Sequence, residues 1–424
     1  MLQLSVLKEQ TERVLAGLAK RNFKTAEADV QAVLDLDQRR RTLQTQHDTA
    51  QGEANDLARR IGSLMKSGEK AEAEALKSRT TTLKTQIKAH ADELADIERQ
   101  QTELLYKIPN IPHESVPAGR SAADNEVVRE GGHKPELPAG AQPHWELIKK
   151  YDIIDFDLGI KITGAGFPVY KGQGARLQRA LINFFLDQAR DAGYTEVQPP
   201  ILVNEASGYG TGQLPDKEGQ MYHDAADNLY LIPTSEVPIT NLYRDEIIAA
   251  DKLPVRNTGY TPCFRREAGS WGADVRGLNR LHQFDKVEIV QITQPEESYA
   301  AHEAMVAHVE KLLQLLELPY RVLRLCGGDM GFTSALTYDL EVWSAAQGRW
   351  LEVSSVSNFE TFQANRLKCR YRAEGGKTQL LHTLNGSALA LPRIVAALLE
   401  NNQTPEGINL PEVLHSYCGF TQIK

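Results

Sequence analysis

Two neighbouring segments carry the most information about the fold: Pro262-Cys263-Phe264-Arg265-Arg266-Glu267-Ala268-Gly269-Ser270 and, after a polar loop, His282-Gln283-Phe284-Asp285-Lys286-Val287-Glu288-Ile289. The pattern predicts a strand that ends in Arg-Arg-Glu, a loop, and a returning strand. Alternation along the returning strand places His282, Phe284, Lys286 and Glu288 on one face. Because a polar face is costly to bury without partners, we interpret it as the floor of a ligand site. A surface hairpin with charge pairs is the alternative.

Two side chains of this hairpin have the chemistry of a nucleotide site. Arg265 offers a guanidinium fork for phosphate or carboxylate, and Phe284 offers an aromatic face for a base. A glycine-rich phosphate loop is not found, because Tyr371 stands where the motif ending in Gly376-Lys377-Thr378 requires glycine. A bound nucleotide would therefore be held by side chains on strands.

Outward from the hairpin, the chain reads as mixed helix and strand from Tyr151 onward. Apolar residues on one face predict a helix over 175–192, and a last helix is expected over 387–401. Strands are expected at 229–232, 258–264, 281–292 and 350–354. Because these strands follow one another through short loops, we expect a largely antiparallel sheet flanked by helices, an α+β fold.

Residues 31–107 differ from this body in composition. They contain no proline, and Tyr106 is their one aromatic residue. Apolar residues recur every seven positions in two segments of similar length, which Lys66-Ser67-Gly68-Glu69 separates. This pattern predicts an antiparallel helical hairpin, each helix roughly 50–60 Å long at ~1.5 Å per residue.

Charge is distributed unevenly along this hairpin. Its distal half, residues 56–90, holds 8 basic and 4 acidic side chains, although the basic and acidic residues of 31–107 balance at 13 each. A positive far end suits a long polyanion such as a folded RNA. A solvated coiled-coil surface and a protein-docking arm are the alternatives.

Composition excludes several classes of protein. No run of about 18 apolar residues occurs among the 424, so we expect no transmembrane helix and no membrane partner. The N-terminus, Met1-Leu2-Gln3-Leu4, lacks the basic and apolar regions of a secretory signal. Four scattered cysteines without a Cys-x-x-Cys pair are typical of reduced cytoplasmic thiols. A net charge of −8 argues against indiscriminate nucleic-acid binding.

The hairpin around Arg265 resembles motif 2 of class II aminoacyl-tRNA synthetases, in the form typical of seryl-tRNA synthetases. The resemblance covers nearly the whole chain. Its further segments are the junction Ile108-Pro109-Asn110, helix 175–192 with Pro199 (motif 1), Thr234-Ser235-Glu236, Leu351-Glu352-Val353-Ser354-Ser355, and Asn385-Gly386-Ser387 with Pro392-Arg393 (motif 3). It implies a class II catalytic domain over 151–424, a junction or linker rich in Pro, Gly and His over 108–150, and an N-terminal tRNA-binding helical arm over 1–107.

The resemblance also implies a reaction and its partners. We expect a cytoplasmic homodimer that activates L-serine with ATP and Mg²⁺ and transfers the seryl group to tRNA-Ser, with tRNA-Sec as a further candidate acceptor. No zinc is expected. A paralogue that activates an amino acid for a non-tRNA carrier, and a non-enzymatic adaptor, are the alternatives.

Roles for individual residues follow from the resemblance alone. The catalytic residues would be Arg265, Glu288 and Arg393. Serine would be bound by Thr234, Ser235, Glu236, Arg265, Glu288, Asn385 and Ser387. ATP would be bound by Arg265, Arg266, Glu267, Leu281, Phe284, Glu352, Val353, Ser354, Ser355 and Arg393.

Glu352 and Ser355 would hold Mg²⁺, for which oxygen ligands are suited. In a regular strand Glu352 shares a face with Ser354 and not with Ser355, so we expect the strand to end or bulge there. Backbone capping is the alternative role for Ser354. We expect Glu288 to read the serine hydroxyl, because a buried carboxylate left unpaired by alanine discriminates strongly.

Overall fold

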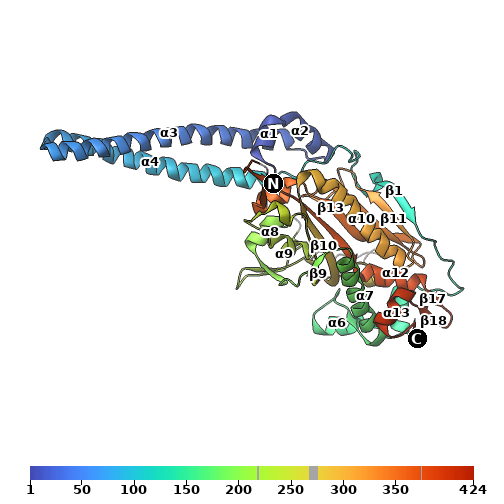
Figure 1. The fold of residues 1–424 in the computed structure, drawn as a ribbon. Helices are drawn as coiled ribbons and strands as arrows, with labels where there is room; N and C mark the ends of the chain where they lie inside the picture. The colour runs from blue at the N-terminus through green and yellow to red at the C-terminus, as the bar shows by residue number, and fades with distance from the viewer. Residues whose placement is uncertain (217–218, 267–275, 374) are drawn as a thin grey trace. The chain divides into compact units, whose positions relative to one another are not determined.

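The computed structural model describes residues 1–216, 219–266, 276–373 and 375–424. Glu267, which we expect to bind ATP, lies outside the described residues. The chain forms two compact units, drawn in Figure 1. One comprises Leu2–Ala19 and Phe23–Pro109, and the other comprises Met1, Lys20–Asn22 and Asn110–Lys424.

The first unit is a helical hairpin, which confirms the predicted arm. It begins with α1 (Leu4–Glu9) and α2 (Thr11–Lys20). The long helices α3 (Ala26–Ser67) and α4 (Lys70–Leu105) run side by side (Figure 1). Gly68 makes the turn between them in a left-handed conformation with φ of 86°, and its N–H donates to the carbonyl of Leu64.

Apolar side chains of the predicted heptads form the seam of this hairpin. Leu43 packs with Leu94 and Ile97, and Leu57 belongs to a second cluster with Leu83. Gln101 interrupts the apolar seam but is buried with a partner, because its Nε2 donates to the carbonyl of Val33 over 3.3 Å. The polar positions of the seam are thus accommodated without breaking the hairpin.

An eight-stranded sheet forms the centre of the second unit. Its order is β1-β11-β12-β13-β16-β10-β9-β4, and all neighbours are antiparallel except β4 and β9. The strands are β1 (Glu126–Gly131), β11 (Tyr320–Arg324), β12 (Leu336–Ser344), β13 (Arg349–Asn358), β16 (His382–Ala390), β10 (Gln283–Thr293), β9 (Val255–Phe264) and β4 (Thr195–Glu196). The predicted α+β class with an antiparallel sheet is confirmed.

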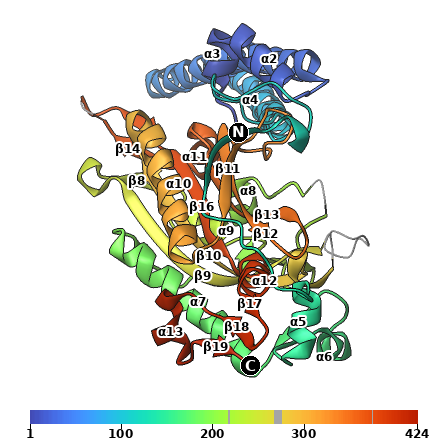
Figure 2. The same ribbon diagram turned by 90° about the vertical axis from the view of Figure 1, so that its right-hand side faces the viewer.

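Helices α7 (Gly172–Asp191), α10 (Ser298–Leu315) and α12 (Leu391–Asn401) pack against this sheet (Figure 2). Val287 and Ile289 of β10 are fully buried in the same core as these helices. Their neighbours Lys286 and Glu288 point to the other face, where α9 (Glu236–Asn241) and α11 (Thr361–Leu367) contact the sheet. Period-two alternation therefore separates the apolar core from the polar face.

Shorter elements complete the unit. The remaining helices are α5 (His144–Lys150), α6 (Phe156–Ile162), α8 (Glu205–Thr211), α13 (Glu412–Cys418) and the 3₁₀ turns η1 (Ala122–Asp124), η2 (Ala250–Lys252), η5 (Gly277–Asn279) and η6 (Pro295–Glu297). Small sheets are formed by β2 (Ile154–Asp155) with β3 (Val169–Tyr170); β5 (Leu202–Asn204), β7 (Leu229–Leu231) and β6 (His223–Asp224); β15 (Thr378–Leu380), β14 (Arg370–Arg372) and β8 (Ile247–Ile248); and β17 (Gln403–Thr404), β18 (Gly407–Asn409) and β19 (Gln422–Ile423). In the described part of the chain, no helix combines the length and the apolar character that crossing a membrane requires.

Two segments differ from the sequence-based expectation. The sequence predicts a linker or junction over 108–150, but residues 110–150 belong to the second unit and contribute edge strand β1 and helix α5 to it. The helix expected over 387–401 begins at Leu391, because residues 382–390 form β16 and Pro392 suits the first turn of a helix. It is not the last helix, since α13 follows it.

Candidate functional site

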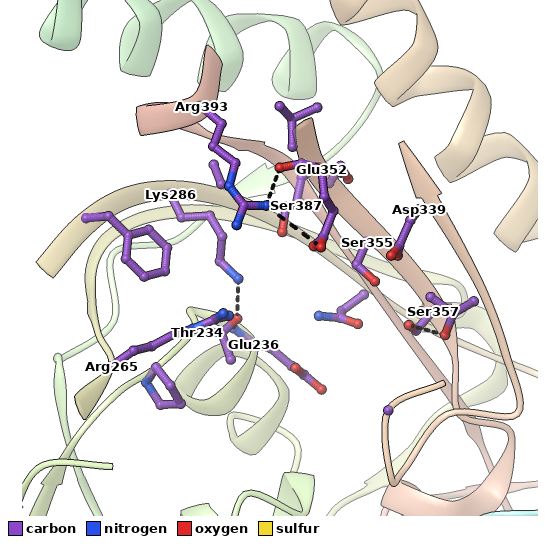
Figure 3. A pocket seen from close by; sticks show the side chains of 18 of the residues that line it. Thr234, Glu236, Arg265, Lys286, Asp339, Glu352, Ser355, Ser357, Ser387 and Arg393 are labelled. Carbon is purple, nitrogen blue, oxygen red and sulfur yellow. Dashed lines mark hydrogen bonds and ion pairs between the residues drawn. The ribbon is translucent and has the colours of Figure 1, made fainter. Parts of the chain in front are cut away.

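A cavity of about 500 Å³ lies on the polar face of the sheet. Its floor includes Lys286 of β10, Ser355 of β13 and Ser387 of β16, and its walls include residues 278–281 with Pro233, Thr234 and Glu236. Arg393, Glu352, Ser355 and Asp339 lie on one side of it, and Thr234, Glu236 and Arg265 lie on the other (Figure 3). The cavity therefore brings together strands and loops that are far apart in sequence.

Arg265 follows directly after β9 and reaches into the cavity. Its backbone N–H donates to the carbonyl of His282 over 2.9 Å, which joins the ends of the two predicted strands. Its guanidinium lies 5.3 Å from the ring centroid of Phe284. Among the described residues its Nε has no hydrogen-bond partner. A buried donor without a partner on a charged side chain is a site ready for an anionic ligand.

Arg393 is fixed at the opposite wall by two backbone carbonyls. Its Nε donates to the carbonyl of Asn279 over 3.1 Å, and its Nη1 donates to the carbonyl of Glu352 over 2.7 Å. The Glu352 carboxylate is 3.8 Å away and half exposed. Since the carbonyls orient the guanidinium without neutralising it, Arg393 retains positive charge for an anion in the cavity.

The predicted irregularity after Glu352 is present as a β-bulge. In the pairing of β12 with β13, Leu340 lies opposite Ser354 and Glu341 lies opposite Glu352, so Val353 is the extra residue. The bulge lets Glu352 and Ser355 both line the cavity. Ser354 Oγ donates to the carbonyl of Ser387 over 2.6 Å, which is the capping role considered from the sequence.

Asp339 adds a second carboxylate on this side of the cavity. It pairs with Ser355 across β12 and β13, and its Oδ1 is buried without a hydrogen-bond partner among the described residues. Burial, followed by the charge of Glu352, raises the pKa of Asp339 well above its usual range. The described residues contain no cluster of three or more His, Cys, Asp or Glu side chains arranged to hold a metal.

Glu288 is fully buried and does not line the cavity. Its Oε2 lies 2.8 Å from Lys286 Nζ, and its Oε1 accepts a 2.7 Å hydrogen bond from Asn385 Nδ2. Lys286 Nζ also donates to Thr234 Oγ1 over 2.7 Å. Lys286, Thr234 and Asn385 line the cavity in front of this carboxylate. Glu288, which we expect to recognise the serine hydroxyl, therefore belongs to a hydrogen-bond network directly behind the residues that line the cavity.

Glu236 is buried, but it is the carboxylate that lines the cavity beside Thr234. Gln363 Nε2 donates to its Oε1 over 2.6 Å, and Gln363 is itself fixed by Thr383 Oγ1 at 2.7 Å and by the carbonyl of Thr211 at 3.1 Å. Burial raises the pKa of Glu236 to about 7, against the hydrogen bond from Gln363. A cationic ligand group beside Glu236 would favour its ionised form.

The structure brings together most of the site residues expected from the sequence. Those that line the cavity are Thr234, Glu236, Arg265, Leu281, Phe284, Glu352, Val353, Ser354, Ser355, Asn385, Ser387 and Arg393. Besides Glu288, Ser235 is buried and bonded to Thr261 Oγ1 at 2.6 Å, and Arg266 is exposed, so neither lines the cavity.

Sequence analysis placed Lys286 on the polar face between Phe284 and Glu288, which it interpreted as the floor of the site, but gave it no role. It did not assign Asp339, Asn279 or Gln363 to the site. Asn279 and Gln363 act through loops and helices whose partners are distant in sequence. No local pattern marks such residues.

Comparison with known proteins identifies the family. Residues 1–112 match the model of the seryl-tRNA synthetase N-terminal domain, and residues 220–402 match that of the tRNA synthetase class II core domain (G, H, P, S and T). The serine–tRNA ligase of Salinibacter ruber is 53% identical over 100% of this chain and 99% of its own length. That of Acidithiobacillus ferrooxidans is 49% identical over 99% of this chain and 98% of its own.

Solved structures give the same answer. The seryl-tRNA synthetase of Pyrococcus horikoshii, crystallised with ATP, is similar with a TM-score of 0.92 and 34% identity, over 100% of this chain and 99% of that one. The sequence motifs, the antiparallel fold with its helical hairpin, and full-length relatives therefore agree. The chain belongs to the seryl-tRNA synthetase family of class II aminoacyl-tRNA ligases.

Proposed function

We propose that this chain activates L-serine with ATP to form seryl-adenylate and transfers the seryl group to the 3′ end of tRNA-Ser. The observation that carries the proposal is the Arg265 guanidinium, which faces the cavity next to Phe284 and whose Nε lacks a partner among the described residues. Full-length similarity to serine–tRNA ligases supports the choice of amino acid. tRNA-Sec is a further candidate acceptor.

In the first step, a serine carboxylate oxygen attacks the α-phosphorus of ATP. An O–P bond forms, the bond to the bridging oxygen of the β-phosphate breaks, and pyrophosphate leaves. The carboxylate is already ionised at neutral pH, so the attack needs no general base. Arg265 would hold both anions in line and offset the charge that develops between them. Phe284 would stack on adenine, and Arg393 would bind the γ-phosphate.

The oxygen donors around Glu352 fit the Mg²⁺ that ATP-dependent chemistry requires. Glu352 and Ser355 would hold the ion, and the buried Asp339 Oδ1, which lacks a partner in the described residues, supports a cation in this place. When bound, Mg²⁺ would supply positive charge that offsets the negative charge of the phosphate groups. Arg393 would act on the same phosphates from the adjoining wall.

Selection of serine would depend on the network around Glu288. Glu236 would pair with the α-ammonium group, and its position beside the neutral Gln363 leaves it in need of a cation. Glu288, held by Lys286 and Asn385, would set the polarity that the serine hydroxyl meets at Thr234 and Asn385. Alanine would leave these polar groups unpaired, a mismatch that discriminates strongly.

The second step would use both units of the chain. The terminal ribose hydroxyl of tRNA attacks the carbonyl carbon of seryl-adenylate, forming the ester and releasing AMP and a proton. We assign tRNA binding to the helical hairpin of residues 1–107, catalysis to residues 151–424, and the connection between them to residues 108–150, which also contribute β1 and α5 to the second unit. The family relationship supports a homodimer as the working form.

Serine-dependent exchange of pyrophosphate into ATP, followed by charging of tRNA-Ser, tests the proposal. We expect both reactions with serine and neither with alanine or threonine at comparable efficiency. Exchange without charging would indicate activation for another carrier, and tRNA-Sec is tested in the same charging assay. Absence of both reactions would contradict the proposal and favour an adaptor.

A further inference from the structure

A buried His–Glu pair lies behind the cavity and takes no part in the chemistry described above. His144, the first residue of α5, and Glu400, near the end of α12, are both fully buried. His144 Nδ1 lies 2.7 Å from Glu400 Oε1, and the same oxygen accepts from the backbone N–H of His144 over 2.9 Å. The pair therefore joins α5 to α12 by two hydrogen bonds.

The second ring nitrogen of His144 connects the pair to the cavity wall. Leu278 N–H donates to His144 Nε2 over 2.9 Å. Because a backbone N–H can only donate, Nε2 must be unprotonated, and Nδ1 then carries the hydrogen that Glu400 accepts. The imidazole is thus a neutral bridge whose two nitrogens have different, fixed roles.

Leu278 belongs to η5, and this turn is connected to α12 by two routes. The carbonyl of the next residue, Asn279, accepts from Arg393 Nε over 3.1 Å, and Arg393 lies seven positions before Glu400 on α12. The turn is therefore attached to one helix at two points: directly through Arg393 and indirectly through His144 and Glu400. Leu278, Asn279 and Leu281 all line the cavity.

The close approach of His144 constrains the turn itself. Gly277 has a φ of 65°, and a Cβ at this position would lie 2.3 Å from His144 Nε2. Arg276 adds an outer attachment to α5, because its guanidinium lies 4.9 Å from the ring centroid of Trp145 and 3.4 Å from Glu146 Oε1. Residues 276–279 are thus held to α5 from inside and outside.

Both carboxylate oxygens of Glu400 accept hydrogen bonds, as suits an ionised carboxylate. Besides His144, Gln347 Nε2 donates to Oε1 over 3.0 Å and Ser344 Oγ donates to Oε2. Burial opposes ionisation, but the hydrogen bonds from His144 and Ser344 outweigh it and hold the pKa of Glu400 below its usual value. An ionised and saturated Glu400 is a rigid anchor for the imidazole.

We propose that His144 and Glu400 are positioning residues for the ATP end of the cavity: through Leu278 N–H they fix the turn whose Asn279 carbonyl orients Arg393. The inference rests on the proposed function, since it assumes that Arg393 and residues 278–281 contact ATP. It assigns no role to the pair in serine binding, because the Lys286–Glu288 network lies at the other end of the cavity.

Two substitutions of the same residue separate positioning from packing. The amide nitrogen of His144→Asn reaches the Nδ1 position and can still donate to Glu400, but the acceptor for Leu278 N–H is lost. The amide of His144→Gln reaches the Nε2 position and retains that acceptor. Leaving a buried N–H unsatisfied costs on the order of a tenfold or greater change in an equilibrium.

We expect His144→Asn to raise the KM for ATP in pyrophosphate exchange about tenfold and to leave the KM for serine within about twofold. His144→Gln should keep the KM for ATP close to that of the wild-type chain, although both variants lower the melting temperature. His415→Asn, which loses a hydrogen bond to the carbonyl of Leu410 away from the cavity, is the control and should change neither KM.

The positioning role would be overturned if both His144 variants changed the KM for ATP and the KM for serine equally. It would also be overturned if neither variant changed either KM. If the buried variants do not fold, Arg276→Ala tests the same turn from its exposed side and should raise the KM for ATP alone. An unchanged KM in that variant would then overturn the inference. Pyrophosphate exchange by the wild-type chain is measured in parallel. If the wild-type chain has no exchange activity, the proposed function is refuted and the positioning role is not.

Discussion

Lys286 and Glu288 form a buried ion pair in which the ammonium lines the cavity and the carboxylate lies behind it. The Nζ to Oε2 distance is 2.8 Å, and both side chains are almost completely inaccessible. Two residues apart on β10, they point to the same face of the sheet. The pair places a positive charge, and not the expected carboxylate, at the surface that an amino acid would meet.

Replacement of Glu288 tests whether this network selects serine. Glu288→Gln keeps the size of the side chain but removes the charge that Lys286 and Asn385 hold. We expect the KM for serine in pyrophosphate exchange to rise by at least about tenfold while the KM for ATP stays within about threefold. Exchange kinetics that remain those of the wild-type chain would refute the assignment of Glu288 to serine selection.

The free energy of unfolding of Glu288→Gln must be measured as well, because removing one partner of a buried ion pair costs about 3–5 kcal/mol. Glu288→Gln with Lys286→Met removes the pair together. If the double variant recovers stability but not serine affinity, the network acts in binding as well as in folding.

Arg265→Lys tests the proposed clamp on the two reactants. Lysine keeps the charge but lacks the planar fork that binds two anions at once. We expect the rate of pyrophosphate exchange to fall by roughly 10²–10³-fold. Arg256→Lys, at the exposed beginning of the same strand β9, serves as the control and should retain activity. A mild loss in Arg265→Lys, equal to that of the control, would contradict the role of the guanidinium.

The proposed metal ligands are tested by magnesium titration. Glu352→Gln removes an anionic oxygen from the half-exposed side of the cavity, so half-maximal exchange activity should require several-fold more Mg²⁺. Mn²⁺ binding to the protein in the presence of ATP, followed by its electron paramagnetic resonance signal, gives a readout independent of turnover. Identical Mn²⁺ affinity in wild-type and variant chains would exclude Glu352 as a ligand.

Glu236 should give stability a specific pH dependence. Its pKa is raised to about 7 in the folded chain, against an ordinary value of 4.5. Between these values the folded state keeps a proton that the unfolded state has lost, so the free energy of unfolding falls as pH rises. Above pH 7 the buried charge costs up to about 3 kcal/mol relative to pH 4.5.

Denaturation of Glu236→Gln at pH 5 and pH 8 measures this contribution. We expect the variant to gain stability relative to the wild-type chain at pH 8 and to gain much less at pH 5. The exposed Glu136→Gln provides the reference and should behave as the wild-type chain does at both values. A difference between Glu236→Gln and wild type that does not change with pH would contradict a raised pKa.

The helical hairpin should matter for charging but not for activation. Lys84→Glu with Lys88→Glu reverses charge at a groove between α3 and α4 in the basic distal half. We expect unchanged pyrophosphate exchange, a higher KM for tRNA-Ser, and a weaker dependence of that KM on salt, because fewer phosphates are neutralised. Lys311→Glu on α10 is the matched control.

Deletion of residues 31–107 extends the same test to the whole hairpin. The remaining chain should still activate serine, because the cavity is built from the second unit alone. Efficient charging by the shortened chain would rule out the hairpin as the tRNA-binding element.

Regular periodicity explains what the sequence could predict. The heptads around Ser67-Gly68 predicted the hairpin, because the geometry of neighbours in sequence is nearly fixed by residue type. The α+β class followed in the same way. The expectation that the strand ends or bulges after Glu352 needed the family resemblance as well, which paired Glu352 with Ser355, and the structure places the bulge at Val353.

Long-range contacts explain what the sequence could not predict. His144 lies in a Pro- and Gly-rich segment for which the sequence predicts a linker, and only its contact with Glu400, 256 positions later, shows that it is buried. Gln363 and Glu236 are likewise 127 positions apart. Polar partners of this kind have no periodic signal, so their burial becomes visible only when the chain is folded.

The most direct test of the central claim is a crystal structure with a non-hydrolysable seryl-adenylate analogue. We predict that the analogue occupies the 500 Å³ cavity, with the guanidinium of Arg265 bonded to the linkage between the seryl and adenylate groups and with adenine on Phe284. An analogue bound elsewhere, with Arg265 directed into solvent, would contradict the account.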